Sequence, residues 1–202
     1  MQNRQRKREE TRRRIIAEAG SLVDAHGYDN VTVEDVCAAA DISRRTFFNY
    51  MDSKDEAVLG PVPFQLTADS LERIRSTQSV NVLDLVISSV EVVPEGTEPS
   101  ISEQRRRLIG ANPALLHLAI ARQHETLAAL EAALTEHYER FPGDRRLLDA
   151  SDTDASEVHA IIALFRSAAG EYFWNPRPEG DPVTQIRHNA NNLTQFAKEL
   201  PW

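Results

Sequence analysis

Apolar residues recur every three or four positions along most of the chain, which is the period of an amphipathic helix. The first such stretch runs from about residue 9 to residue 26, and Gly27 follows it where a helix end favours glycine. Its apolar positions are Ile15, Ile16, Ala19, Leu22 and Val23. The pattern predicts a first helix over these residues.

Two short helices and a tight turn are predicted next. Thr32 with Asp35 three residues later is typical of a capped helix start, and Val33, Val36, Cys37 and Ala40 then give the helix an apolar stripe. Ser43 can cap the following helix by accepting from the backbone N–H of Arg45 or Thr46. The interval between the two helices is therefore expected to be a turn.

The faces of this third helix differ in character. Phe47 and Met51 lie four residues apart and can face inward together. Arg44, Arg45, Phe48 and Asn49 are left on the other faces. One side is expected to pack, and the other is free to contact a partner.

A fourth helix is predicted to begin at Lys54. Ser53 and Glu56 have the spacing of a capping box, and a lysine at a helix N-terminus is well placed for a phosphate group. Gly60-Pro61-Val62-Pro63 cannot continue a regular helix. We expect a domain boundary here, which gives domains of residues 1–60 and 61–202.

The second domain is also expected to be helical. Periodic apolar stretches predict helices over residues 64–75, 81–93, 100–111, 113–138, 152–169 and 183–200. Residues 81–93 are apolar on most sides and indicate a buried helix, with a strand as the weaker alternative because so many are β-branched. The fold class is therefore all-α, with about nine helices and no convincing strand.

The second and third helices have the form of a helix-turn-helix, whose second helix lies in the DNA major groove. The surrounding sequence resembles the DNA-binding domain of the TetR (tetracycline repressor) family over about residues 10 to 60. The matching segments are Val31-Thr32-Val33, Asp35-Val36-Cys37-Ala38-Ala39-Ala40, Ile42-Ser43, Thr46-Phe47-Phe48, Tyr50-Met51 and Ser53-Lys54. Asp41 stands where the family often has Gly, and Phe48 stands where a Tyr is common, which removes a hydroxyl that could reach phosphate.

The resemblance implies an N-terminal three-helix DNA-binding domain followed by a helical ligand-binding and dimerisation domain. It implies a homodimeric regulator, usually a repressor that a small ligand releases from its operator. With the capping Ser43 included, the candidate DNA-binding residues are Thr32, Ser43, Arg44, Arg45, Thr46, Asn49, Tyr50 and Lys54.

Charge is unevenly distributed along the chain. The net charge is -8, but residues 1–14 hold seven basic and two acidic side chains, whereas residues 61–202 hold 13 basic and 20 acidic ones. Such polarity is expected if only one end of the chain approaches DNA. The basic start is interpreted as an arm that contacts the minor groove or phosphates.

Composition excludes several classes of protein. The polar N-terminus and the absence of a long apolar run lead us to expect a cytoplasmic protein with no membrane partner. Cys37, the single cysteine, is expected to lie in the core, with a redox-sensing thiol as the lesser alternative. No metal-ligand spacing, phosphate loop or nucleophile motif is present, so we expect neither an enzyme nor a cofactor.

Two groups of polar residues have simple interpretations. Arg105, Arg106 and Arg107 are successive and point around a helix, so a solvated face is favoured over an anion site. The helix histidines have no ligand spacing and are interpreted as ordinary residues. They are His117, His124, His137, His159 and His188.

The most direct functional hypothesis is a repressor that leaves a palindromic double-stranded DNA operator when an apolar or amphipathic effector of unknown identity binds. Candidate effector contacts, for which plain core packing is the alternative, are Phe64, Leu83, Ile87, Leu108, Leu116, Phe165 and Trp174. Dimerisation is expected through the last two helices. Their candidate residues, which can instead face the intrachain core, are Ile161, Phe165, Ile186, Leu193 and Phe196. A second hypothesis is a ligand-sensing or protein-interaction module of the same fold that binds no operator.

Overall fold

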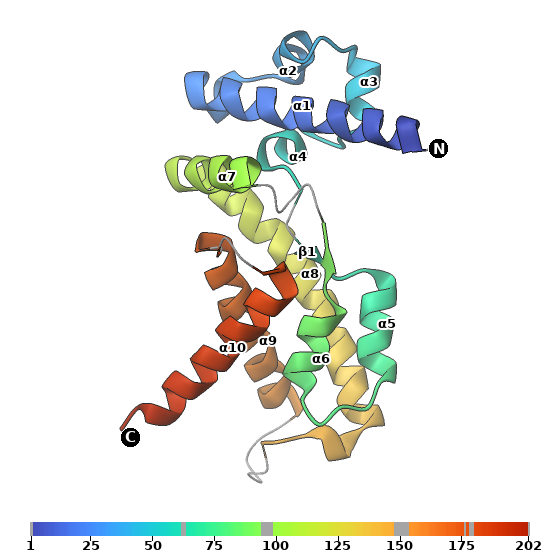
Figure 1. Ribbon diagram of the computed structural model, residues 1–202, viewed down its shortest axis with the longest axis vertical. Coiled ribbons are helices and arrows are strands. Elements are labelled where there is room, and N and C mark those ends of the chain that lie inside the picture. The colour runs from blue at the N-terminus through green and yellow to red at the C-terminus, as the bar shows by residue number, and fades with distance from the viewer. Residues whose placement is uncertain are drawn as a thin grey trace. The chain divides into compact units, whose positions relative to one another are not determined.

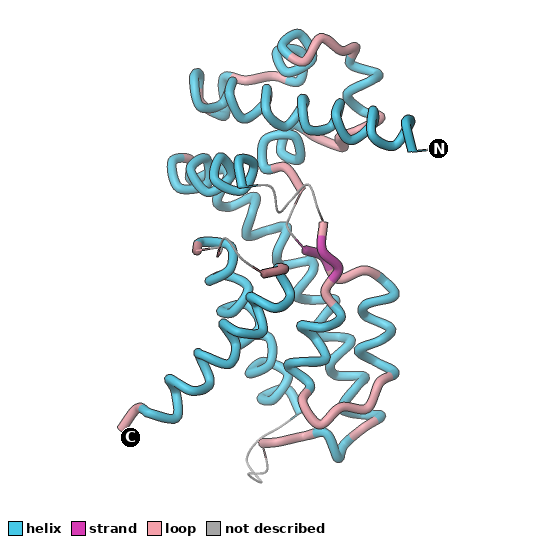
Figure 2. Tube along the Cα trace, viewed as in Figure 1, coloured by secondary structure: helices cyan, strands magenta, loops and turns pink. Residues whose placement is uncertain are grey.

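The computed structural model describes residues 2–61, 64–93, 99–147, 154–175, 177 and 180–201. Within these ranges the chain is built almost wholly of helices, as Figures 1 and 2 show, and its strands are β1 (Phe64–Gln65) and β2 (Glu91–Val92). The two strands pair antiparallel. The predicted all-α class is confirmed.

The chain divides into two compact units. Unit 1 consists of Met1–Pro63 and Val93–Arg122, and unit 2 consists of Phe64–Val92 and Gln123–Trp202. The long helix α8 (Pro113–Arg140) contributes residues to both. A domain boundary at residue 60 stays a prediction.

In unit 1, α1 (Gln2–His26) packs against α2 (Val33–Ala39) and α4 (Lys54–Leu59). Its buried face is the apolar stripe expected from the sequence, with Ile15 and Ile16 almost fully buried. The helix begins at Gln2, earlier than predicted. Lys, Arg, Gln and Glu all have good helix propensity, so a segment without apolar periodicity can still extend a helix that is anchored further along.

Arg105 corrects the predicted solvated face. It lies on α7 (Pro99–Ala111) and is only 4% exposed. Its Nε donates to the Leu59 carbonyl oxygen at 2.7 Å, and its Nη2 donates to the Pro61 carbonyl oxygen. The carbonyls at a helix C-terminus have no partner within their own helix, so the guanidinium satisfies the exit of α4. Arg107 is exposed and pairs with Asp24 on α1.

Unit 2 packs the later part of α8 with α5 (Ala68–Ser76), α6 (Val82–Ser89), α9 (Asp154–Trp174) and α10 (Pro182–Glu199). One hydrophobic core joins these helices, and its most deeply buried members come from each of them. They are Ile74, Val86, Ile87, Leu130, Ala133, Leu134, Tyr138, Val158, Ala168 and Ile186.

Two predicted helices are shorter than expected. The helix predicted from Phe64 begins at Ala68, where Thr67 caps it by accepting from Ser70 N, and Phe64 lies in β1. The helix predicted to reach residue 93 ends at Ser89, and Val92 lies in β2. β-Branched residues favour extended backbone, so the strand alternative was correct for the end of this stretch.

The five apolar residues considered for dimerisation differ in how deeply they are buried. Phe165 and Ile186 are 4% and 0% exposed, and both belong to the core of unit 2. Ile161 and Leu193 are partly buried against the same core. Phe196 is 62% exposed, so of these positions it is the one with most surface left for another molecule.

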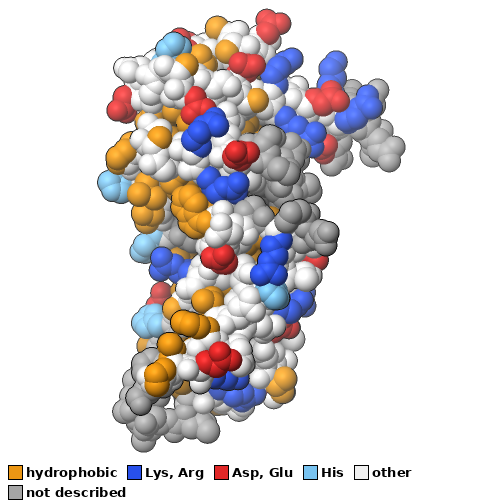
Figure 3. Space-filling view, turned by 60° about the vertical axis from the view of Figure 1, so that its left-hand side comes forward, with side chains coloured by type: hydrophobic (Ala, Val, Ile, Leu, Met, Phe, Trp, Pro, Cys, Tyr) orange, Lys and Arg blue, Asp and Glu red, His pale blue; other side chains and the backbone are white. Residues whose placement is uncertain are grey.

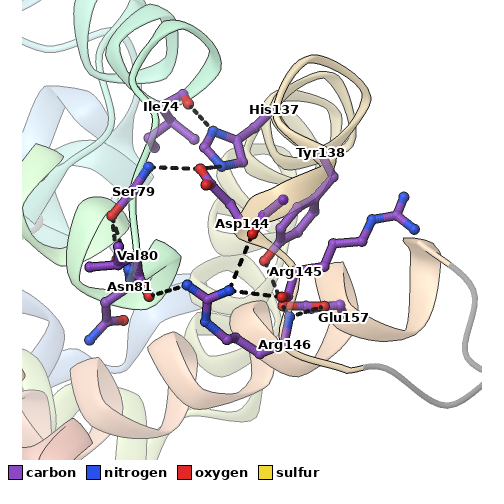
Figure 4. Close-up of polar contacts among 11 residues, drawn as sticks. Ile74, Ser79, Val80, Asn81, His137, Tyr138, Asp144, Arg145, Arg146 and Glu157 are labelled. Carbon is purple, nitrogen blue, oxygen red and sulfur yellow. Dashed lines mark hydrogen bonds and ion pairs between the residues drawn. The ribbon is translucent and has the colours of Figure 1, made fainter.

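A buried polar cluster connects α8 with two neighbouring loops (Figure 4). His137 is fully buried, and its Nδ1 lies 2.8 Å from the Ile74 carbonyl oxygen, which can only accept. Nδ1 therefore carries a proton. The Nε2 atom lies 3.2 Å from Oδ2 of the buried Asp144, and the same oxygen accepts from Ser79 N at 2.7 Å.

Glu157, on α9, forms the second half of this cluster and is 5% exposed. Its carboxylate accepts from the backbone N–H groups of Arg146 at 2.9 Å and Leu147 at 3.1 Å. It also accepts from the Tyr138 hydroxyl at 3.1 Å. Burial, together with the nearby Glu157 carboxylate, raises the pKa of the Tyr138 phenol, so Tyr138 remains a donor at neutral pH.

We expect the substitution Glu157→Gln to lower the free energy of unfolding by roughly 1–3 kcal/mol, because a buried acceptor of several hydrogen bonds becomes a partial donor that faces other donors. Urea denaturation measures this loss. The control is Glu131→Gln on α8, whose side chain is 53% exposed. Its effect should stay within about 0.5 kcal/mol. Equal losses in the two variants would show that the cluster does not stabilise unit 2.

Candidate nucleic-acid interface

The helix-turn-helix begins with a complete capping box. Thr32 Oγ1 accepts from Asp35 N at 3.2 Å, and Thr32 N donates to Asp35 Oδ2 at 2.8 Å. The side-chain hydrogen bond from Thr32, then the backbone one, lowers the pKa of the Asp35 carboxyl. The predicted start of α2 is therefore confirmed at the level of its hydrogen bonds.

The turn after α2 contains a residue with a left-handed backbone. Asp41 has a φ of 50°, and among the described residues no other non-glycine residue has a positive φ. Aspartate tolerates this conformation better than most residues, so it can replace the glycine that is common at this position. Ile42 N then donates to the Cys37 carbonyl oxygen at 3.0 Å, which closes the turn.

The second helix of the helix-turn-helix, predicted to be the recognition helix, is α3 (Arg44–Phe48). Ser43 caps it by accepting from Thr46 N at 3.1 Å. Phe47 and Met51 are 0% and 1% exposed, as the spacing predicts. The four side chains expected on the other faces are all exposed, namely Arg44, Arg45, Phe48 and Asn49.

Arg44 is aligned by two neighbours. Its Nη1 lies 2.7 Å from Glu34 Oε1 on α2, and its Cζ lies 5.7 Å from the centre of the Phe48 ring. The Arg44 and Glu34 side chains are 67% and 60% exposed. An ion pair this exposed contributes little stability, so Arg44 can exchange Glu34 for another anion at small cost.

The remaining candidates differ in how much of each side chain is accessible. Arg45 and Asn49 are exposed on α3 and its C-cap. Tyr50 is half-buried, and the Arg8 guanidinium on α1 lies 5.7 Å from its ring centre. Thr32 and Ser43 are exposed, although their hydroxyls are used as caps, and Thr46 is half-buried.

Lys54 has an internal role that the sequence did not indicate. Its Nζ donates to the carbonyl oxygens of Tyr28 at 2.9 Å and Val31 at 3.0 Å, and lies 3.8 Å from the centre of the Tyr28 ring. The Tyr28 hydroxyl donates to Asp55, the next residue of α4. Burial and this hydrogen bond raise the pKa of Tyr28. A phosphate contact by Lys54 stays a prediction.

Tyr28, Lys54 and Asp55 together form a clasp, by which we mean this set of contacts between the loop before α2 and the start of α4. Sequence reasoning included Lys54 and missed the other two residues. The sequence of this loop is rich in turn-forming residues. Nothing in the local sequence connects Tyr28 with Lys54 and Asp55, which lie 26 and 27 positions further along the chain.

Basic and acidic side chains are mixed on unit 1. On the face that Figure 3 shows, Lys and Arg side chains are interspersed with Asp and Glu side chains. Arg6 lies 3.5 Å from Glu10, and Arg12 lies 2.9 Å from Glu56 on α4. Part of the cationic segment is therefore already neutralised within the chain.

Four candidate effector residues lie in one cluster. Phe64, Leu83, Ile87 and Phe165 all belong to the core of unit 2 or pack against it, and the Phe64 and Phe165 rings are 6.3 Å apart, edge to face. The other three are elsewhere. Trp174 is 51% exposed at the end of α9, while in unit 1 Leu108 is buried and Leu116 is 42% exposed. Ligand contact by any of them stays a prediction.

Other chemistry has little support in the part of the chain that the structure describes. No group of three or more His, Cys, Asp or Glu residues there is placed to hold a metal ion. The helices in those ranges include none with the length and apolar character needed to cross a membrane. Cys37 is buried, and its burial raises the pKa of the thiol, which disfavours the reactive thiolate.

Comparison with known proteins agrees with this geometry. Residues 15–59 match the family described as bacterial regulatory proteins, tetR family. The chain is 29% identical over 179 residues to the HTH-type transcriptional regulator TcmR of Streptomyces glaucescens, a match that covers 81% of this chain and 72% of TcmR. It is 35% identical over 88 residues to the HTH-type regulator YvaF of Bacillus subtilis strain 168, covering 43% of this chain and 46% of YvaF.

A solved structure of a TetR-family regulator from Syntrophomonas wolfei is also similar, with a TM-score of 0.46, 16% identity, and coverage of 96% of this chain and 97% of the other. The capped, arginine-bearing α3 and the matches to this segment define a DNA-binding transcriptional regulator of the helix-turn-helix class. Residues 15–59 of the chain are thus similar to the tetR family of bacterial regulatory proteins, and the chain as a whole is similar to a regulator of the helix-turn-helix type.

We expect Lys54→Met to lower the free energy of unfolding by roughly 1–3 kcal/mol, because two carbonyl oxygens lose a charged donor. Thermal or urea unfolding measures the loss. The control is Lys198→Met, which removes the same charge from an exposed position near the end of α10. If Lys54→Met and the control have the same free energy of unfolding, the clasp does not stabilise the helix-turn-helix.

Proposed function

We propose that the chain is a homodimeric repressor that binds a palindromic operator and releases it when a small apolar or amphipathic effector binds. The observation that supports this proposal most directly is the arrangement of buried and exposed side chains on α3. Two buried side chains fix this helix, and two exposed arginines stand in its first turn, where recognition helices meet base edges. Such a protein acts on DNA without catalysing a reaction, in the cytoplasm.

Dimerisation follows from the geometry of operators. Two recognition helices read successive major grooves when they lie about one helical turn (~34 Å) apart, and the chain has one such helix among its described residues. Exposed apolar side chains on α9 and α10 support an interface on these helices. They are Trp174 at 51%, Phe196 at 62% and Leu200, just beyond α10, at 37% exposed.

Effector binding is supported by the apolar character of unit 2. Its hydrophobic core joins four candidate contacts. An effector that binds the DNA-incompetent arrangement more tightly shifts the equilibrium toward release. The chemistry of this core favours a largely apolar compound.

Substituting Arg44 or Arg45 by alanine should weaken operator binding in different ways. An arginine that reads guanine contributes roughly 1–3 kcal/mol of discrimination, whereas one that contacts phosphate weakens binding to all sequences and lowers the salt slope by about 1. The measurement is fluorescence anisotropy against operator and random DNA at several salt concentrations. Sedimentation should show two chains bound to each palindrome.

The matched control for this experiment is Arg140→Ala, at an exposed position at the end of α8 and outside the proposed dimer interface. It should leave both affinity and salt slope close to those of the unsubstituted protein. If neither arginine variant changes DNA binding, α3 is not the reader. If the chain itself binds no DNA with sequence preference, the protein is instead a ligand-sensing or protein-interaction module.

The effector can be sought from the operator itself. Genomic binding locates the operator, and substrates of the neighbouring gene product are screened for release, with an expected loss of affinity of roughly 5- to 150-fold. Leu83→Ala should weaken the response to an active compound, whereas Leu71→Ala, partly buried against the same core, should not. Compounds that bind unit 2 without changing operator affinity would contradict release by effector.

A further inference from the structure

Phe48 is an apolar side chain on the exposed side of the recognition helix. It is 46% exposed, while the adjacent Phe47 is fully buried. The two rings meet edge to face, with centres 5.3 Å apart and planes at 85°. Phe48 is therefore supported from the protein side by a fully buried ring.

Besides Phe47, the Phe48 ring has a cationic neighbour. Arg44, one helical turn earlier, places its Cζ 5.7 Å from the ring centre, and Glu34 holds the same guanidinium. Because residues i and i+4 share a helix face, a donor-rich group and an apolar ring lie together on one exposed surface. Whatever DNA segment contacts Arg44 also comes close to Phe48.

The chemistry of the ring limits what it can recognise. Phenylalanine has no hydrogen-bond donor or acceptor, so it cannot read the polar edge of a base. In the major groove the apolar group that distinguishes one base from the others is the C5-methyl of thymine. Burying that methyl against a ring removes apolar surface of both from water.

We propose that Phe48 is a specificity-determining residue that reads the C5-methyl of one thymine in each operator half-site, beside the base contacted by Arg44. This inference rests on the proposed operator binding. The separation of 5.7 Å between guanidinium and ring compares with a rise of about 3.4 Å per base pair, so the two side chains reach the same or neighbouring base pairs.

The experiment removes only the methyl. Each thymine of an operator half-site is replaced in turn by deoxyuridine, which keeps base pairing and every polar group. At one thymine we expect the replacement to lower the affinity roughly fourfold per half-site. This fold-change corresponds to the free energy of about 0.8 kcal/mol for burying one CH₂-sized group. At the other thymines the methyl should have a smaller effect.

The variant Phe48→Ala completes the cycle. It should bind the thymine and deoxyuridine forms equally at the sensitive position, because the methyl then has no ring to contact. Phe48→Leu keeps an apolar side chain and should retain part of the sensitivity to the methyl. It therefore distinguishes loss of the methyl contact from loss of binding through misfolding. The matched control is Ile120→Ala on α8, which is 53% exposed and should keep the full sensitivity.

Two results would overturn the inference and leave the proposed function intact. One is operator binding that no single methyl affects. The other is a Phe48→Ala variant as sensitive to the same methyl as the unsubstituted protein, which would assign the contact to another residue. Failure of the proposed function is distinguishable, because the chain would then show no preference between operator and random DNA.

Discussion

A helix of five residues cannot hold its shape in water through its own hydrogen bonds. Nucleating a helix fixes several residues for a single bond, and isolated helices shorter than roughly 12–15 residues are marginal. α3 is such a helix, and the proposed operator contacts depend on its exposed face. Its conformation must therefore come from contacts outside it, chiefly the burial of Phe47 and Met51 and the cap of Ser43.

The same constraint explains why the ends of the short helices carry so many specific contacts. α2 has its capping box, and α4 has the Ser53 cap, the clasp at its start and Arg105 at its exit. The capping contacts and Arg105 satisfy backbone groups that a short helix leaves without an internal partner, whereas the clasp ties the start of α4 to the loop before α2. In a helix of six or seven residues most backbone groups are terminal, so these contacts determine the geometry of the reader more than helix propensity does.

The sequence predicted those contacts whose partners are close along the chain. Thr32, Ser43 and Ser53 cap where their spacing indicates, and Asp41 takes the left-handed conformation that the turn needs. The apolar stripe of α1 was also readable, because one face of a helix repeats with a fixed period. These features decided the fold class and the position of the recognition helix.

Contacts between distant residues could not be predicted in this way. Arg105 reaches a carbonyl 46 residues earlier, and Lys54 reaches back to Tyr28 and Val31, although both lysine and arginine are usually exposed. His137 shows the same limit, because its partners Ile74 and Asp144 come from two different loops or helix ends. Helical spacing identifies the face of a residue but not the segment that covers that face.

The placement of Glu34 beside Arg44 bears on how such a reader can be selective. Phosphate attracts every arginine equally, and this attraction provides most non-specific binding. A carboxylate 2.7 Å from the guanidinium competes with any phosphate at little cost to stability, since the pair is exposed. Only a site that also contacts other groups on the same face, such as the Phe48 ring, compensates for losing the carboxylate. In the proposed function Glu34 thus lowers the affinity of Arg44 for phosphate in general and leaves discrimination to the other groups on the exposed face of α3.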